Sequence, residues 1–318
     1  METKTLILPK LETISEIYTE LGTSETKLEQ DVKILKEWMR KQPHLPDPDD
    51  DEKKVDEKRI KNILLTCKNS LEKTKAVLDG HYTIKRLVPE YFSNWDPTAP
   101  ELIQSIQQSC YFPFPKPTHE GNRVSLYCVR DGYTDGKYVH GDVNKLCFMT
   151  LDLRIGKLDT FKKEIIIMDY KNTTMNQIAA ALPNIKKVVE SAQAAFPLRA
   201  HSIHVINTTS FVQPLLNLML SLLKKKINER VFIHKSVEDL KNYIDPSVLP
   251  LNFGGTYPKT SDEMIADWQD ELIKHREWFL IQSSIVADNS KRPKNSRNSL
   301  DHLENTITGG SFRKLDVD

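Results

Sequence analysis

The chain has 318 residues, of which 39% are hydrophobic and 28% charged, a composition typical of a soluble globular protein with one large domain or two smaller ones. Its 45 basic and 44 acidic residues give a formal net charge of +1, which argues against a nucleic-acid-binding protein that depends on overall charge. Four cysteines without a C-x-x-C pair, no signal-peptide pattern and no apolar run of transmembrane length predict a cytoplasmic protein with reduced thiols.

The amino-terminal part of the chain is predicted to be helical. From Leu28 to Met39 apolar residues recur at spacings of 4, 3 and 4, and Ser24 is a suitable amino-terminal cap. Two further helices are expected at residues 53–67 and 71–87.

A proline-rich segment at residues 111–117 predicts an irregular connection, and after it the hydrophobic period changes. Residues 124–129, 164–169 and 202–207 are predicted strands. The stretch 175–189 has helical spacing, with a kink expected at its proline. Strands that alternate with helices predict an α/β fold, with a mostly parallel β-sheet flanked by helices.

The most informative segment is residues 209–230, TSFVQPLLNLMLSLLKKKINER. Seven of the nine residues from Leu215 to Leu223 are leucine or methionine, so this helix must be buried or must cover an apolar surface. A basic cluster follows at once, formed by Lys224, Lys225, Lys226 and Arg230. Two interpretations remain open, a core helix with a solvated basic end and an apolar lid beside an anionic surface.

The motifs of phosphate loops, dinucleotide sites, serine hydrolases and zinc proteases do not occur in the sequence. His201 and His204 are three residues apart on a predicted strand, so they point to opposite faces and cannot share one metal ion. Asp169 ends an apolar strand, but no base, nucleophile or metal cluster can be assigned beside it. We therefore assign no catalytic residue, metal site or cofactor from these motifs.

An ordered set of phrases resembles the CRAL-TRIO family of lipid-binding proteins, which includes the α-tocopherol transfer protein and cellular retinaldehyde-binding protein. The phrases are LKEWMRKQPHLP (35–46), SLEKTKAVLDGHYTIKRLVPEYF (70–92), EIIIMDY (164–170), FPLRAHSIHVIN (196–207), KKKINER (224–230) and LPLNFGG (249–255). They span roughly residues 25–285 in the order found in the family. The closing GSFRKL is similar to insect members that are tocopherol-transfer-like, clavesin-like or retinaldehyde-binding.

The chain is predicted to have four parts. The resemblance implies two of them, a helical amino-terminal domain at residues 1–95 and a CRAL-TRIO lipid-binding domain at 96–258, while helical spacing by itself predicts the carboxyl-terminal helix at 259–287 and a polar, basic composition the unfolded tail at 288–318. The lipid-binding domain would enclose one long apolar pocket, with a helical gate at about residues 210–223 over its mouth.

The resemblance also implies which residues meet the ligand. The positions for the pocket and its gate are Cys147, Leu151, Ile167, Phe196, Leu198, Ile203, Val212, Leu215, Leu218, Met219 and Leu222. For the gate residues ligand contact is favoured, whereas for Phe196 and Ile203 core packing is an equal alternative. Cys147 and Leu151 replace two serines of the tocopherol carrier, so a more apolar pocket wall is expected there.

A second implied surface would contact phosphoinositides or other anionic lipids. Its positions are Arg199, His201, Lys226 and Arg230, extended by Lys224 and Lys225. The tocopherol carrier has an arginine where this chain has His201, so the charge at this position would depend on pH.

Together these features predict a cytosolic carrier that is not an enzyme, associates peripherally with membranes and has no nucleic-acid partner. It would bind a single hydrophobic ligand, a retinoid, tocopherol, carotenoid or phospholipid, and exchange it at anionic membranes, including those with phosphoinositides. Two alternatives remain. One is a phosphoinositide-responsive adaptor in membrane trafficking whose tail recruits a protein, and the other is a hydrolase or isomerase that acts on an apolar substrate in the pocket.

Overall fold

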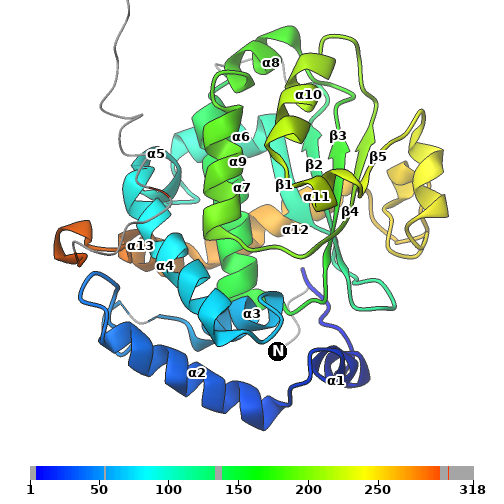
Figure 1. Cartoon of the computed structure of the whole chain (residues 1–318). Helices are drawn as coiled ribbons and strands as arrows, with labels where there is room; N and C mark the ends of the chain where they lie inside the picture. Colours follow the sequence, from blue (N-terminus) through cyan, green and yellow to red (C-terminus); the bar gives the residue numbers. More distant parts are fainter. Residues whose placement is uncertain (1–4, 54, 133–137, 294–299, 301–318) are drawn as a thin grey trace, which may run out of the picture.

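The computed structural model describes residues 5–53, 55–132, 138–293 and 300. At its centre is a five-stranded sheet in the order β1-β2-β3-β4-β5, in which β1 is antiparallel to β2 and the other neighbours are parallel (Figure 1). The strands are β1 (Ser109–Pro113), β2 (Arg123–Val129), β3 (Glu164–Asp169), β4 (Ala200–Ile206) and β5 (Val231–Ile233). The predicted α/β fold with a mostly parallel sheet is confirmed, and β2, β3 and β4 match the three predicted strands.

The two outer strands, β1 and β5, differ from the sequence-based expectation. Residues 111–113 were predicted to be irregular, yet they form the end of β1. A proline is compatible with an edge strand, because the missing N–H is not needed on the unpaired side. β5 has only three residues, which is too few for a periodic pattern to show.

Helices make up the amino-terminal part of the chain, as predicted. They are α1 (Leu11–Glu20), α2 (Glu25–Arg40), α3 (Glu57–Thr66), α4 (Leu71–Leu87), α5 (Pro89–Phe92) and α6 (Pro100–Gln108). Ser24 caps α2, because its hydroxyl accepts a hydrogen bond of 3.3 Å from the Lys27 amide. The predicted apolar face of α2, from Leu28 to Met39, is buried.

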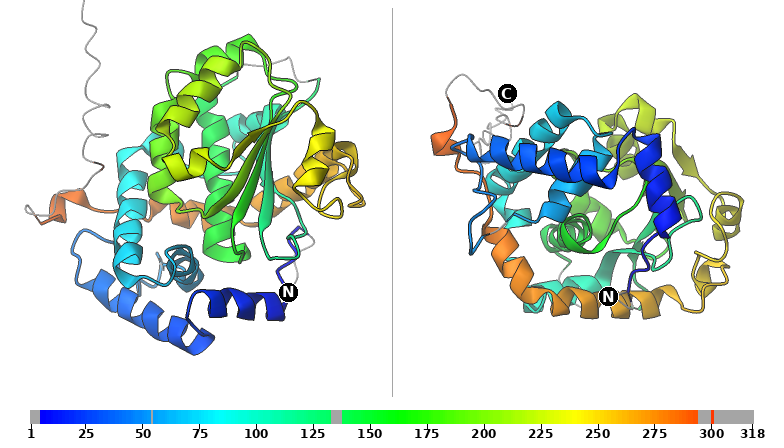
Figure 2. Two further views of the ribbon diagram at one scale, coloured as in Figure 1. Left: turned by 45° about the vertical axis from the view of Figure 1, so that its right-hand side comes forward. Right: turned by 90° about the horizontal axis from the view of Figure 1, so that it is seen from below.

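The sheet lies between two helical layers (Figures 1 and 2). One layer contains α7 (His140–Leu153), α8 (Met175–Ala181), α9 (Ile185–Ala195), α10 (Gln213–Leu222) and the short α11 (Lys225–Asn228). On the other side lies α12 (Ser261–Lys274), which is followed by α13 (Arg276–Ser284). The helix predicted over residues 175–189 is interrupted near Pro183, because proline lacks the N–H that an unbroken helix requires. Within the described ranges, every helix is too short or too polar to cross a bilayer.

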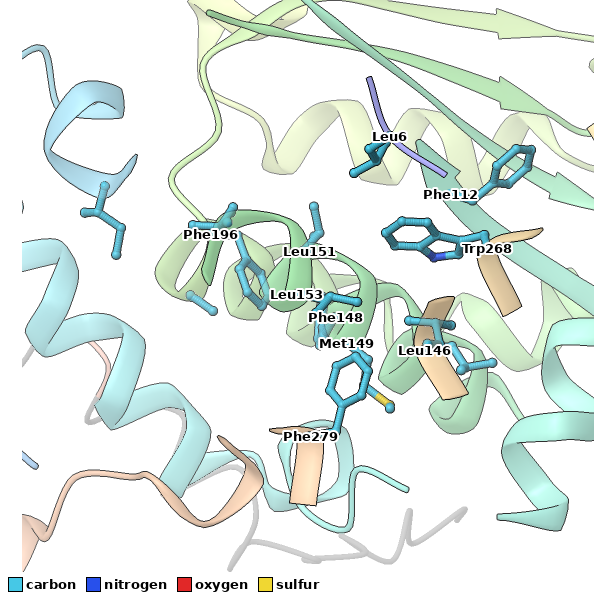
Figure 3. Close-up of a cluster of buried hydrophobic side chains, with 14 of the residues drawn as sticks. Leu6, Phe112, Leu146, Phe148, Met149, Leu151, Leu153, Phe196, Trp268 and Phe279 are labelled. Atoms are coloured by element: carbon cyan, nitrogen blue, oxygen red, sulfur yellow. The ribbon is translucent and has the colours of Figure 1, made fainter. Parts of the chain in front are cut away.

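Buried apolar side chains form two separate clusters. The larger one joins the amino-terminal helices, α7, the sheet and the carboxyl-terminal helices, and the rings of Phe148, Phe196 and Phe279 belong to it (Figure 3). The smaller one packs the sheet against α8, α9 and α10. Since the larger cluster contains residues from all three of the predicted folded parts, the division of the chain into domains stays a prediction.

The first residues of the predicted unfolded tail are ordered. Residues Asn289–Lys291 form a 3-10 turn, and the Asp288 amide donates a hydrogen bond of 2.8 Å to the His44 carbonyl. Arg292 forms an ion pair of 2.6 Å with Asp79 on α4. This pairing holds the start of the segment against the amino-terminal helices. Residues 294–299 and 301–318 lie outside the described residues.

Candidate functional site

An apolar cavity of about 190 Å³ lies between the sheet and the layer of α7, α8, α9 and α10. Met168 on β3 lies on the sheet side, and Ala181, Val189, Leu215 and Met219 lie on the helix side. No Asp, Glu, Lys or Arg of the described ranges lines this cavity. Such a space suits an apolar molecule, because a charged group inside it would have no counter-charge.

The alternation of side chains along the strands creates the apolar floor beneath this helical layer. Ile166 and Met168 of β3 lie opposite Ile203 and Val205 of β4 in the parallel register. All four side chains belong to or pack against the smaller apolar cluster. Their neighbour Ile167 points to the opposite face and is fully buried in the larger cluster.

The predicted ligand-contact residues therefore fall into two groups. Cys147, Leu215 and Met219 line the cavity. Ile203, Val212 and Leu222 belong to or pack against the apolar cluster around it, and Leu218 on α10 is 38% exposed.

Four further predicted positions are in neither the cavity wall nor the smaller cluster. Ile167, Leu151, Phe196 and Leu198 belong to or pack against the larger cluster. Ile167 is on the other side of the sheet. The Phe196 ring packs against Phe148 at a centroid distance of 5.6 Å, so aromatic rings of the larger cluster already fill the space around Phe196 (Figure 3).

The helix α10 has apolar side chains on both of its sides. Leu215, Leu216 and Met219 are buried under it, whereas Leu218 faces solvent. Pro214 lies in its first turn, where a missing N–H costs nothing. A helix that covers a cavity with one side and offers leucine to solvent on the other has the properties expected of a lid.

The basic residues lie next to this helix. Lys224, Lys225 and Lys226 are exposed after the end of α10, with Lys225 and Lys226 forming the start of α11, and none of them forms an ion pair with a described residue. Arg230 directly precedes β5, and its guanidinium donates a hydrogen bond to the Ala200 carbonyl at the start of β4. The three lysines thus form a free cationic surface beside α10, while Arg230 also has a structural role.

The amino-terminal edge of the parallel strands gathers further positive charge. Arg199 and His201 lie at the start of β4, and Lys163 directly precedes β3. Burial, reinforced by Arg199, lowers the pKa of Lys163, so these two cations are neighbours. Burial and then Lys163 lower the pKa of His201, which favours its neutral form at neutral pH. The sequence analysis missed Lys163, although a Lys-Lys pair before a predicted strand is a readable signal.

Glu20, the last residue of α1, neutralises part of this basic edge. Its carboxylate pairs with Lys162 and lies 3.6 Å from Arg199. The hydrogen bond from Lys162 holds the pKa of Glu20 below its ordinary value, so the carboxylate is charged at neutral pH. An anionic partner of the basic edge would therefore compete with Glu20.

Comparisons with known proteins place this site in context. Residues 107–255 match the family model described as "CRAL/TRIO domain", and residues 24–102 match "Pinta-like, UBA domain". "Alpha-tocopherol transfer protein-like" of Mus musculus is 25% identical over 256 residues, which cover 79% of this chain and 71% of that protein. "Clavesin-2" of Rattus norvegicus is 22% identical over 314 residues, which cover 96% of this chain and 93% of that protein. A solved structure, "Crystal structure of Sfh5", covers 84% of this chain and 100% of its own, with a TM-score of 0.46 and 12% identity.

Proposed function

Because residues 107–255 of this chain are a CRAL/TRIO domain, we propose that the protein is a non-enzymatic carrier that binds one hydrophobic ligand and exchanges it at anionic membranes. The observation that supports this most is the apolar cavity beneath α10. Relatives with tocopherol transfer in their names support the same class of cargo, and a retinoid, tocopherol, carotenoid or phospholipid remains the proposed range.

The size of the cavity implies that α10 moves when the ligand enters. Its volume of about 190 Å³ is below the roughly 300–1,000 Å³ of sites that enclose a drug-sized ligand. Sheltering about twenty carbons from water would contribute on the order of 10 kcal/mol, at about 0.8 kcal/mol per methylene. That contribution is large enough to offset the displacement of α10 and of the few residues it buries.

Filling the cavity with a side chain tests the carrier function. Ala181 lines the cavity and is 5% exposed, so Ala181→Phe would place a ring where the ligand is expected. We expect wild-type protein to yield about one apolar molecule per chain on solvent extraction and mass spectrometry, and the variant to yield at least about tenfold less.

The matched control is Ala179→Phe, because Ala179 is on the same helix but exposed. It should retain the wild-type amount of extracted ligand, and a circular dichroism spectrum should show that both variants are folded. Equal amounts of ligand from all three proteins would contradict the proposed pocket.

The basic surface supports exchange at anionic membranes, and Glu20 offers a way to test it. Removing its charge by Glu20→Gln should free Lys162 and Arg199 for lipid head groups. The substitution raises the local net charge by one unit, and at about 1 kcal/mol per unit charge near a membrane we expect about fivefold tighter binding to vesicles that contain phosphatidylserine, measured by co-sedimentation.

Glu16→Gln provides the control for net charge, since Glu16 is exposed on the same helix. It should change vesicle binding by much less than Glu20→Gln. An equal gain in both variants would mean that net charge, and not release of the basic edge, governs binding.

A further inference from the structure

One part of the cavity wall is polar, although most of it is apolar. Tyr138 and His140, at the start of α7, line the cavity together with Thr173, which lies just before α8. The sequence analysis did not predict any of these three positions.

Two buried polar atoms in this part have no hydrogen-bond partner among the described residues. They are Nε2 of His140 and Oγ1 of Thr173. An unsatisfied buried group costs about 1–3 kcal/mol, and the large majority of buried side-chain polar atoms in native proteins are paired. Since both atoms belong to residues of the cavity wall, a molecule inside the cavity is well placed to provide the missing partner.

The protonation state of these groups limits that partner. Burial lowers the pKa of His140 to about 4 and raises the pKa of Tyr138 to about 12, so both groups are neutral at neutral pH. The Tyr138 hydroxyl lies 3.3 Å from Nδ1 of His140. When Tyr138 donates this hydrogen bond, the single ring proton is on Nε2, which becomes a donor toward a bound molecule. The Thr173 hydroxyl both donates and accepts.

We propose that Tyr138, His140 and Thr173 form a subsite for an uncharged oxygen function, a hydroxyl or a carbonyl, at the polar end of a long apolar ligand. This inference rests on the proposed carrier function and restricts the class of ligand that the carrier would bind. A carboxylate or phosphate is disfavoured in the subsite, because no cation of the described ranges lines the cavity to pair with it.

The test uses three C20 isoprenoids that differ only slightly in size. Geranylgeraniol carries a hydroxyl, geranylgeranoic acid a carboxylate, and phytane no oxygen. Their affinities are obtained from displacement of the neutral fluorescent probe Nile red. We expect wild-type protein to bind the alcohol at least about tenfold more tightly than the acid at neutral pH.

Two variants of similar shape locate the effect. His140→Phe and Thr173→Val should each weaken binding of geranylgeraniol by about fivefold to tenfold and leave the affinity for phytane unchanged. Ser191→Ala is the control, because the Ser191 hydroxyl is also buried and unpaired among the described residues but is not in the cavity wall. It should leave both affinities unchanged.

The outcomes separate the subsite from the carrier function. If all variants bind alcohol and hydrocarbon as the wild type does, the pocket stands and the subsite is wrong. The subsite is also wrong if the variants weaken alcohol and hydrocarbon equally, since the loss would then be one of packing. If wild-type protein binds neither Nile red nor any of the three isoprenoids, the carrier function itself is contradicted, and the subsite with it.

Discussion

Replacing Asp152 with alanine is expected to lower the free energy of unfolding by about 3–5 kcal/mol, the largest loss of stability that we predict. Asp152 on α7 is fully buried and accepts hydrogen bonds of 2.5 Å and 3.0 Å from the Arg59 guanidinium on α3. Gln282 on α13 accepts a third bond from Arg59, at 3.1 Å. Without Asp152 the buried guanidinium would keep as its counter-charge only the partly exposed carboxylate of Asp56, 3.8 Å away. Urea denaturation followed by circular dichroism measures the loss.

Asp49→Ala is the control for an exposed carboxylate. Asp49 pairs with Lys36 and Arg40 at the surface, where its side chain is 42% exposed. Exposed pairs contribute about 0–1 kcal/mol, so this variant should unfold close to the wild-type denaturant concentration. Similar losses of unfolding free energy in both variants would show that the buried Arg59–Asp152 pair stabilises the fold no more than an exposed pair.

The same pair predicts how stability depends on pH. Burial alone would raise the pKa of Asp152, but Arg59 together with Lys85 and His81 outweighs it and holds the pKa below the ordinary value of 3.8. The contribution of Asp152 is therefore fully present above pH 3.8 and is lost as the pH falls through the lower folded-state value. The difference between wild type and Asp152→Ala should shrink in that acid range and stay constant at neutral pH.

Replacing Lys224, Lys225 and Lys226 together with glutamine is expected to reduce affinity for anionic vesicles by about 100-fold, and to slow ligand transfer to them accordingly. The three side chains are exposed beside α10, and about 1 kcal/mol per lysine near the surface sums to about 3 kcal/mol. Affinity for the ligand in solution should not change, because none of the three lines the cavity. Arg230 is left in place, since its hydrogen bond to Ala200 supports β4. Transfer between vesicles of defined phosphatidylserine content, followed by fluorescence, provides the measurement.

A second triple variant keeps the change in net charge the same. Lys27, Lys33 and Lys41 are exposed on or beside α2, and their replacement with glutamine should change transfer far less. Raising the salt concentration should reduce the difference between the two triple variants, because exposed charges are screened. Equal slowing by both would rule out a docking role for the lysines beside α10.

The parts of the fold that sequence reasoning predicted are those whose signals are local. The helical spacing from Leu28 to Met39 and the apolar runs of β2, β3 and β4 are each contained in one segment. By contrast α1 was missed, because the residue before it, Lys10, makes no side-chain capping bond that a sequence pattern would announce. β1 and β5 exist because a neighbouring strand pairs with them, which no local pattern shows.

Sequence reasoning could predict those residues of the candidate site whose role follows from their position in one segment of the chain. Leu215 and Met219 follow from the apolar helix before the lysines, and Cys147 from the resemblance. Ile167 shows the limit of that approach, because moving one residue along a strand transfers a side chain to the other face of the sheet. His140 and Thr173 are 33 residues apart and meet the same cavity only through packing of α7 and α8 against the sheet. No periodic signal marks such a pair.

The separation of the buried apolar residues into two clusters has a consequence for the relation between global stability and local opening. Because the buried residues of α10 all belong to the smaller cluster, a subglobal opening in which α10 detached would leave the larger cluster packed. A thermal melt would then report the stability of the larger cluster, whereas amide hydrogen exchange in α10 would report the local opening that the proposed ligand release requires. Substitutions that stabilise the larger cluster would therefore raise the melting temperature without changing the rate of the proposed ligand release.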